Sequence, residues 1–275
     1  MVSRTLRAVI RALASALPPS VVRAVGRAQF RSPLAARLVR GAAARLPTTG
    51  TIRHGVGAGL RFDATGGYPG YLLGTSEPEE QAFLAAHLRP GDVFYDLGAN
   101  IGFYATIAAR IVGPRGHVYA FEPHPESAAA VVRNAQLNDL QNVTLVAAAV
   151  SDRDGRLSLS LSESSATHRL GGGDAGVEVD VVALDSWAAR TGSRAPTFVM
   201  IDVEGAELDV LRGMRDLLGR ARPVVCCEVH WLGRAFPDYV DRELGPLGYT
   251  LTDLSGRPAP AGAERWHAAL IPPRS

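Results

Sequence analysis

Lysine is absent from this chain of 275 residues, and all 29 of its basic residues are arginine. Cysteine is also scarce. Cys226 and Cys227 adjoin one another, and neighbours on a strand point to opposite faces, so the two form neither a disulfide framework nor a zinc site. No apolar run approaches the roughly 20 residues that cross a bilayer. These absences favour a protein of the reducing cytoplasm, either free or peripherally attached to a membrane.

The charges are unevenly distributed along the chain. Residues 1–62 contain eleven arginines and no Asp or Glu, whereas residues 63–275 carry 18 arginines against 27 acids. We therefore divide the chain into an Arg-rich helical extension, residues 1–62, and an acidic domain, residues 63–275. In the extension, residues 4–17 place apolar side chains at helical spacing with arginines between them. Two roles are open for residues 1–45, namely packing on the acidic domain and peripheral contact with an anionic membrane.

From residue 78 onward, short β-rich apolar runs alternate with helical stretches. This alternation predicts parallel strands joined by crossover helices. Alternating polar and apolar residues on both sides of three glycines predict a hairpin, and two late runs predict a final antiparallel pair. The expected fold is a doubly wound, mostly parallel, seven-stranded Rossmann-like α/β sheet. The expected strands are Val93–Leu97, His117–Phe121, Val143–Ala148, Thr197–Val203 and Val224–Val229, the hairpin Leu157–Leu161 and Val177–Leu184, and the last pair Tyr249–Leu251 and Ala268–Ile271.

The first of these runs leads into a glycine-rich turn. Its order is Asp96-x-Gly98-x-Asn100-x-Gly102, and Glu122 ends the second run. Such a turn permits close approach of a nucleotide-like ligand, and a carboxylate after the second strand can accept hydrogen bonds from both ribose hydroxyls. Dehydrogenases use G-x-G-x-x-G to present amides to a pyrophosphate, which this turn does not match.

An acid and an amide in the turn suit S-adenosylmethionine, which carries an ammonium and a sulfonium but no phosphate. We therefore predict that Asp96, Gly98, Asn100, Gly102 and Glu122 bind this cofactor, with NAD(P) as the alternative. Without any ligand, the acid would cap the following helix and the glycines would only permit close packing.

Several stretches between residues 70 and 230 carry a more specific pattern. They are Leu72–Glu79, Gly91–Tyr104, Phe121–Pro123, Leu184–Asp185, and Ile201–Glu207 followed by Val210–Gly213. In these stretches the chain resembles the FkbM family of S-adenosylmethionine-dependent methyltransferases, most distinctively in the run Asp-Val-Glu-Gly-Ala-Glu. The resemblance implies methyl transfer to a hydroxyl oxygen of a small molecule, natural product, sugar or glycoconjugate. One departure is Met200, where the family often has lysine, and it leaves open a different substrate or mechanism.

Asp202 ends the fourth run, and open α/β sheets bind ligands outside the carboxyl ends of their strands. We predict that it is catalytic or that it binds the cofactor's ammonium. Glu228 and His230 end the fifth run and are the other predicted catalytic residues, although a histidine there could be purely structural. Glu204 is a predicted substrate contact. Glu207 is expected to interact favourably with the dipole of the helix that it begins. The spacing of these groups predicts no metal, although Asp202, Glu204 or Glu228 could reach a divalent ion.

Other acceptors are disfavoured by what the chain lacks. Enzymes that methylate amines of bases resemble one another in an Asn/Asp-Pro-Pro-aromatic run, where this chain has Asp202–Gly205. Methylation of a pyrimidine carbon needs an exposed thiolate, and neither Cys226 nor Cys227 is expected to be exposed.

Two alternatives stay open. One is an RNA methyltransferase with residues 1–62 as a basic arm, which the acidic domain disfavours. The other is a non-catalytic, S-adenosylmethionine-binding or membrane-associated module.

Overall fold

The structure is a computed structural model that describes residues 48–65, 70–159, 176–260 and 262–273. The chain divides into two compact units, Met1–Pro78 and Glu79–Ser275. The described elements of the first unit are the antiparallel pair β1 (Thr49–Thr51) and β2 (Arg61–Asp63), and helix α4 (Gly70–Leu73). Residues 1–47 lie outside the described residues, so the predicted extension and its boundary stay predictions. Within the described residues, no helix has the length and apolar character of a membrane span.

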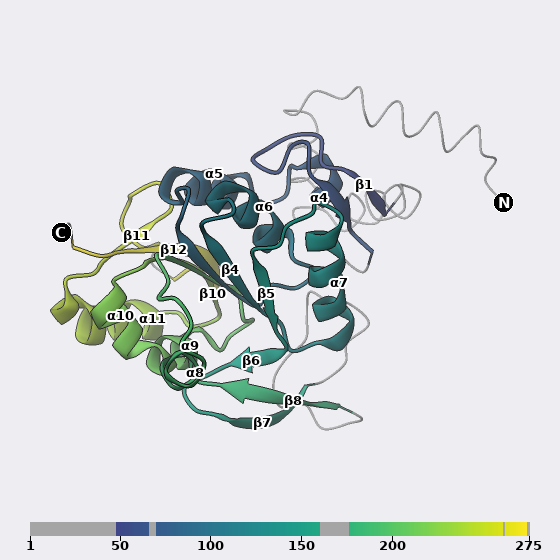
Figure 1. The fold of residues 1–275 in the computed structure, drawn as a ribbon. Coiled ribbons are helices and arrows are strands. Elements are labelled where there is room, and N and C mark those ends of the chain that lie inside the picture. Colours follow the sequence, from purple (N-terminus) through teal and green to yellow (C-terminus); the bar gives the residue numbers. More distant parts are fainter. Residues whose placement is uncertain (1–47, 66–69, 160–175, 261, 274–275) are drawn as a thin grey trace. The chain divides into compact units, whose positions relative to one another are not determined.

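A seven-stranded sheet forms the centre of the second unit (Figure 1). Its order is β11-β12-β10-β9-β3-β4-β5, with parallel pairing from β10 to β5 and antiparallel pairing of β12 with both neighbours. This confirms the predicted doubly wound sheet and its antiparallel last pair. The strands are β3 (Val93–Leu97), β4 (His117–Phe121), β5 (Val143–Val146), β9 (Phe198–Ile201), β10 (Val224–His230), β11 (Thr250–Asp253) and β12 (Arg265–Ile271).

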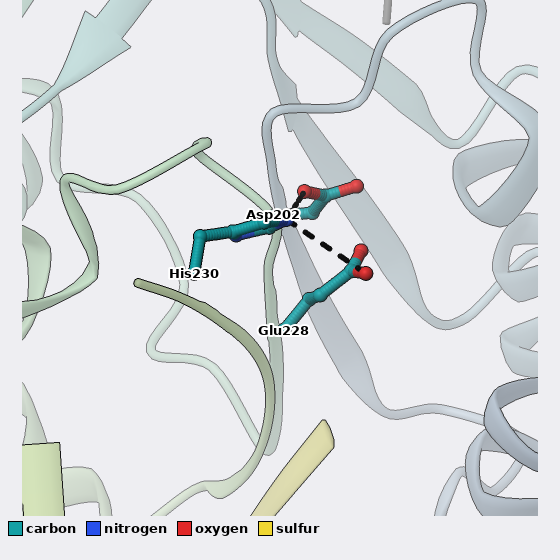
Figure 2. A group of neighbouring side chains, drawn as sticks. All are labelled: Asp202, Glu228 and His230. Carbon is teal, nitrogen blue, oxygen red and sulfur yellow. Dashed lines mark ion pairs between the residues drawn. The ribbon is translucent and has the colours of Figure 1, made fainter. Parts of the chain in front are cut away.

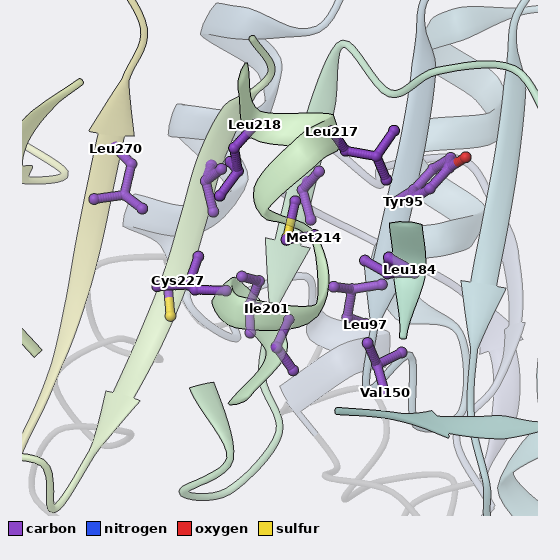
Figure 3. Packing of buried hydrophobic residues seen from close by; sticks show 14 of the residues in the cluster. Tyr95, Leu97, Val150, Leu184, Ile201, Met214, Leu217, Leu218, Cys227 and Leu270 are labelled. Carbon is purple, nitrogen blue, oxygen red and sulfur yellow. The ribbon is translucent and has the colours of Figure 1, made fainter. Parts of the chain in front are cut away.

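Helices cover both faces of this sheet. Successive side chains of each strand point to opposite sides, so both faces present side chains on which helices pack. On one face, Tyr95, Leu97 and Ile201 pack in a buried cluster with α8 to α11 (Figure 3). On the other face, Phe94 and Phe198 are in ring contact, and α6 packs on β3 and β4. The helices are α5 (Pro78–His87), α6 (Phe103–Val112), α7 (Pro125–Gln136), α8 (Leu184–Thr191), α9 (Glu207–Gly213), α10 (Arg215–Ala221) and α11 (Ala235–Tyr239), followed by a π-helix (Val240–Leu244) and a 3₁₀ turn (Gly245–Leu247).

A second sheet of three strands has the order β6-β8-β7, with β6 (Ala148–Val150), β7 (Gly155–Leu159) and β8 (Val177–Val182). Antiparallel pairing of β7 with β8 confirms the predicted hairpin, whose tip lies outside the described residues. The predicted run Val143–Ala148 is instead divided between two sheets, because β6 pairs in parallel with β8.

Candidate active site

The turn after β3 is closely packed inside the protein. Gly98 and Gly102 have φ of 86° and 81°, a region that glycine enters without steric cost. A Cβ on Gly98 would lie 1.9 Å from the carbonyl oxygen of Asp202, and one on Gly102 would lie 3.0 Å from Cα of Val131. Glycine is therefore required here for packing, and the approach of a ligand to these glycines stays a prediction. The same contact joins the turn after β3 to the loop after β9.

Two buried acceptor atoms of this turn have no hydrogen-bond partner among the described residues, Oδ2 of Asp96 and Oδ1 of Asn100. Burial raises the pKa of Asp96 to about 7, although the backbone amide of Ala105 favours the charged form. Asn100 has a φ of 49°, a strained conformation of the kind that gathers at functional sites. A ligand with an ammonium or hydroxyls would donate hydrogen bonds to both acceptors, so the turn fits S-adenosylmethionine, which carries both.

Glu122 organises the same turn from the end of β4. Its Oε2 accepts a hydrogen bond from the Asn100 amide at 2.7 Å, and its Oε1 accepts one from the His124 amide at 2.8 Å. Burial raises the pKa of Glu122 to about 7 in spite of these two bonds. Each carboxylate oxygen keeps a second lone pair, so these two bonds leave room for ribose hydroxyls, and that contact stays a prediction.

The three predicted catalytic side chains gather at the carboxyl ends of β9 and β10, with Asp202 just after β9 and Glu228 and His230 near the end of β10. One ligand atom each of Asp202, Glu228 and His230 lies within 4.8 Å of the others (Figure 2). Nε2 of His230 is 3.9 Å from Oδ1 of Asp202 and 3.7 Å from Oε1 of Glu228. The Asp202 side chain is 44% exposed, whereas those of His230 and Glu228 are 0% and 5% exposed. Asp202 is therefore the member that a ligand reaches, and the catalytic roles stay predictions.

Glu207 fixes the ring of His230. Its Oε1 lies 2.7 Å from Nδ1 of His230 and accepts a hydrogen bond from the Gly205 amide at 3.0 Å. A carboxylate only accepts, so Nδ1 donates to Glu207 and Nε2 faces the other carboxylates. Nε2 is buried and has no hydrogen-bond partner among the described residues. The sequence offered only a helix-dipole role for Glu207, because its contact depends on the end of another strand.

Glu204 completes the cluster from the loop after β9. Its Oε2 lies 3.7 Å from Nε2 of His230, and its side chain is 21% exposed. Burial raises its pKa, and its φ of 51° is strained for a residue other than glycine. The structure thus places this predicted substrate residue beside the predicted catalytic ones, and its contact with a substrate stays a prediction.

Two side chains of β12 hold Glu228. Nε of Arg265 donates to Oε1 of Glu228, and Nε2 of His267 lies 3.6 Å from that oxygen. Burial alone would raise the pKa of Glu228, but the bonds from His267 and Arg265 outweigh it and hold the pKa at about 2. Burial lowers the pKa of His267, yet its bonds to Glu228 and Glu80 bring it to about 10. No local pattern indicates Arg265 or His267, because antiparallel pairing brings them to β10.

Trp231 adds an apolar surface to the site. It is 51% exposed, with a φ of 53°, and its ring centroid is 5.2 Å from that of His230. A Cβ on Gly205 would lie 3.9 Å from the indole. Trp187 and Trp266 are buried, so Trp231 is the exposed indole among the described residues, and it lies beside His230.

Comparisons with known proteins identify the family of the chain. A family model described as the methyltransferase FkbM domain matches residues 96–251. Similar curated proteins are a 2-O-methyltransferase, NoeI, of Sinorhizobium fredii (26% identical, 57% of this chain and 66% of that protein), and a hexuronic acid methyltransferase, AglP, of Haloferax volcanii (29%, 50% and 56%). A third is a 31-O-demethyl-FK506 methyltransferase of Streptomyces tacrolimicus (33%, 56% and 71%). The chain matches 66% and 56% of the lengths of the first two.

Proposed function

Because the chain belongs to the FkbM methyltransferase family, we propose that it transfers the methyl group of S-adenosylmethionine to a hydroxyl oxygen. The acceptor is a small molecule, and a sugar or glycoconjugate is the class best supported by relatives named as a 2-O-methyltransferase and a hexuronic acid methyltransferase. One observation carries the proposal. The turn with unpartnered buried acceptors contacts, through Gly98 and Asp202, the loop that bears the acidic cluster.

The turn after β3 would hold the methyl donor. Asp96 and Asn100 offer acceptors for its ammonium and hydroxyls, Glu122 offers the ribose contact, and Gly98 and Gly102 keep the backbone close. When bound, S-adenosylmethionine supplies a methyl group activated by a positively charged sulfur. The chain's part is to orient that group toward the loop after β9.

The acceptor hydroxyl must approach the methyl carbon in line with sulfur. Its oxygen forms the new bond as the carbon–sulfur bond breaks with its electron pair on sulfur, and the hydroxyl proton leaves. Positioning supplies much of the barrier reduction. Asp202 is the proposed first proton acceptor because it is open to a ligand, and the fully buried His230, 3.9 Å away, is the proposed acceptor of the proton from Asp202. Glu228 stays ionised beside them, and Glu204 is the proposed acceptor contact.

A turnover assay tests the proposal. Purified full-length protein is incubated with S-adenosylmethionine and a panel of sugars, glycolipids, hydroxylated polyketides and RNA, and S-adenosylhomocysteine and the methylated product are quantified. We expect product only with hydroxylated small molecules or glycoconjugates. Methylated RNA would favour the RNA alternative. Calorimetric binding of S-adenosylhomocysteine with no turnover on any acceptor would favour a non-catalytic module, and binding of NAD(P) in its place would reject the proposal.

The arginine-rich segment carries a second part of the proposal. Eleven arginines without an acid in residues 1–62 support contact between residues 1–45 and an anionic surface, and we propose the cytoplasmic face of a membrane. The full chain should bind phosphatidylglycerol vesicles at low salt and release them at about 0.5 M salt, where charges are screened. If the full chain does not bind vesicles, and deletion of residues 1–47 lowers its thermal stability, the result would indicate that this segment packs on the acidic domain instead.

A further inference from the structure

We propose that Asp202, Glu228 and His230 form a binding site for a divalent transition-metal ion, for which Mn²⁺ is the probe. The three residues offer two carboxylate oxygens and one imidazole nitrogen from the ends of two adjacent strands. Manganese accepts both kinds of ligand, whereas Mg²⁺ prefers oxygen alone. The site is a property of the chain, so metal binding does not depend on the proposed methyl transfer.

The state of His230 is the first argument. Its side chain is fully buried, yet Nε2 has no hydrogen-bond partner among the described residues and points at carboxylates. In the neutral ring with its proton on Nδ1, a lone pair on Nε2 would face oxygen atoms of Asp202, Glu204 and Glu228 at 3.7 to 3.9 Å. Lone pairs facing one another in a buried place repel, and a cation between them removes the repulsion.

The support behind His230 is the second argument. Metal-bound histidines almost always donate their other ring N–H to a carboxylate or carbonyl, which fixes the tautomer and the ring orientation. Glu207 has this position, since its fully buried carboxylate lies 2.7 Å from Nδ1 and is itself anchored by the Gly205 amide. A histidine used only for packing has no need of a second buried acid aligned with its ring.

The distances also suit one ion. With metal–ligand bonds of about 2.1 Å, two ligand atoms on one ion are separated by at most about 4.2 Å. Nε2 of His230 lies 3.9 Å from Oδ1 of Asp202 and 3.7 Å from Oε1 of Glu228, both inside that limit. The ligand atoms of Asp202 and Glu228 lie within 4.8 Å of each other, so the two carboxylates would draw closer by up to about 0.6 Å on binding an ion. Asp202 is 44% exposed, which leaves a route for the ion and for an added oxygen ligand.

The charge balance points the same way. Asp202, Glu204, Glu207 and Glu228 surround the ring of His230, and the guanidinium of Arg265 is the cation bonded to Glu228. When the four acids are ionised, three negative charges are uncompensated, because the His267 charge is matched by Glu80. A divalent ion would reduce this excess. An acceptor hydroxyl bound to the ion would lose its proton more easily, and Asp202, through its second oxygen, would then accept that proton without relay to His230.

The test is a metal titration of the full-length protein after treatment with a chelator, without methyl donor or acceptor. Isothermal titration calorimetry and the electron paramagnetic resonance of Mn²⁺ should show one ion per chain, with Mg²⁺ at least tenfold weaker. Glu228→Gln and His230→Gln should each weaken Mn²⁺ binding at least tenfold, whereas Glu178→Gln, which changes an exposed acid on β8, should not. Thermal melts establish that each variant is folded.

Arg265→Gln separates a metal site from a merely structural cluster. Loss of its guanidinium frees Glu228 and removes a repelling charge, so Mn²⁺ binding should become at least threefold tighter, whereas general damage to the cluster would weaken it. Absence of Mn²⁺ binding at millimolar concentration, or binding that Glu228→Gln and His230→Gln leave unchanged, would overturn the proposal. A chain that binds S-adenosylhomocysteine but no metal would keep the proposed function and lose only the metal site.

Discussion

The two halves of the candidate site both bury carboxylates at the carboxyl edge of one sheet, and they stabilise them in opposite ways. Beside β3 and β4, Asp96 and Glu122 receive backbone amides, and burial raises both pKa values to about 7. Beside β10, Glu228 receives the charged side chains of Arg265 and His267, which hold its pKa at about 2. Backbone amides therefore do not compensate here for the hydration that a buried carboxylate loses, whereas the charged side chains of Arg265 and His267 do.

Each half of the candidate site suits a different kind of ligand. In the β3–β4 half the carboxyls of Asp96 and Glu122 have raised pKa values, and acceptors of Asp96 and Asn100 lack donors, so it suits a ligand that brings hydroxyls and a positive charge. The β9–β10 half gathers four acids around one histidine, with a guanidinium on Glu228, so it suits a proton in transit or a cation. Four substitutions test this division, from the largest expected effect to the smallest.

Asp202→Asn should lower kcat about 10²- to 10⁴-fold, because it removes the open proton acceptor of the anionic half. Affinity for S-adenosylhomocysteine, measured by calorimetry, should change by less than about threefold. Asp209→Asn is the matched control, since Asp209 is an exposed acid of α9 that pairs with Arg212. If affinity falls with turnover, Asp202 binds the methyl donor and the division between the halves is drawn in the wrong place.

Asp96→Asn should flatten the pH dependence of stability. The pKa of the Asp96 carboxyl is about 7 in the folded chain, above the ordinary 3.8 of the unfolded chain. Above about pH 4.5 this carboxyl has therefore lost its proton in the unfolded chain but keeps it in the folded chain. The free energy of unfolding therefore falls as pH rises, by about 1.4 kcal/mol per unit for each such group. Glu122 contributes a slope of the same sign.

The window from pH 4.5 to 6.5 isolates this effect. Glu228, with a depressed pKa, loses its contribution only below pH 4.5, and His267, with a raised pKa, loses its contribution only above pH 6.5. Urea titrations across the window should give a smaller slope for Asp96→Asn than for the natural chain or Asp209→Asn. Equal slopes would show that the β3–β4 half carries ionised carboxylates, as the other half does.

Glu122→Ala should weaken binding of S-adenosylhomocysteine about 10- to 100-fold, the equivalent of about 1.5–3 kcal/mol for a charge-assisted hydrogen bond. The loss combines the ribose contact with the support that Glu122 gives to the Asn100 amide. Glu126→Ala, an exposed acid at the start of α7, is the control for calorimetry. Unchanged affinity would show that the methyl donor does not bind in the β3–β4 half.

Trp231→Ala should raise the KM of the acceptor about three- to fivefold, corresponding to roughly 0.5–1 kcal/mol of lost aromatic contact. S-adenosylhomocysteine affinity should stay unchanged, because the indole belongs to the β9–β10 side. Leu157→Ala, another exposed apolar residue, is the control. An effect on the donor rather than on the acceptor would contradict the assignment of this face.

Sequence reasoning located the elements whose signals are local. β3 and β4 have the predicted bounds, and Asp202 directly follows β9, since apolar runs ending at turn residues are read within a few positions. The division of the Val143–Ala148 run was missed, because pairing of β6 with distant β8 decides it. Arg265 and His267 were missed for the same reason: register between β12 and β10 places them at Glu228. Pairing across distant segments leaves no periodic trace.

The insertion of β12 between β10 and β11 also sets the order in which the site can mature during synthesis. Domains fold from the N-terminal side as the ribosome delivers the chain. Glu228 reaches its strand 37 residues before Arg265 is translated, as their spacing in the chain shows. Until β12 enters the sheet, this carboxylate has no cation from that strand and its burial is costly. The carboxylate of Glu228 therefore gains its cations only when β12 joins the sheet.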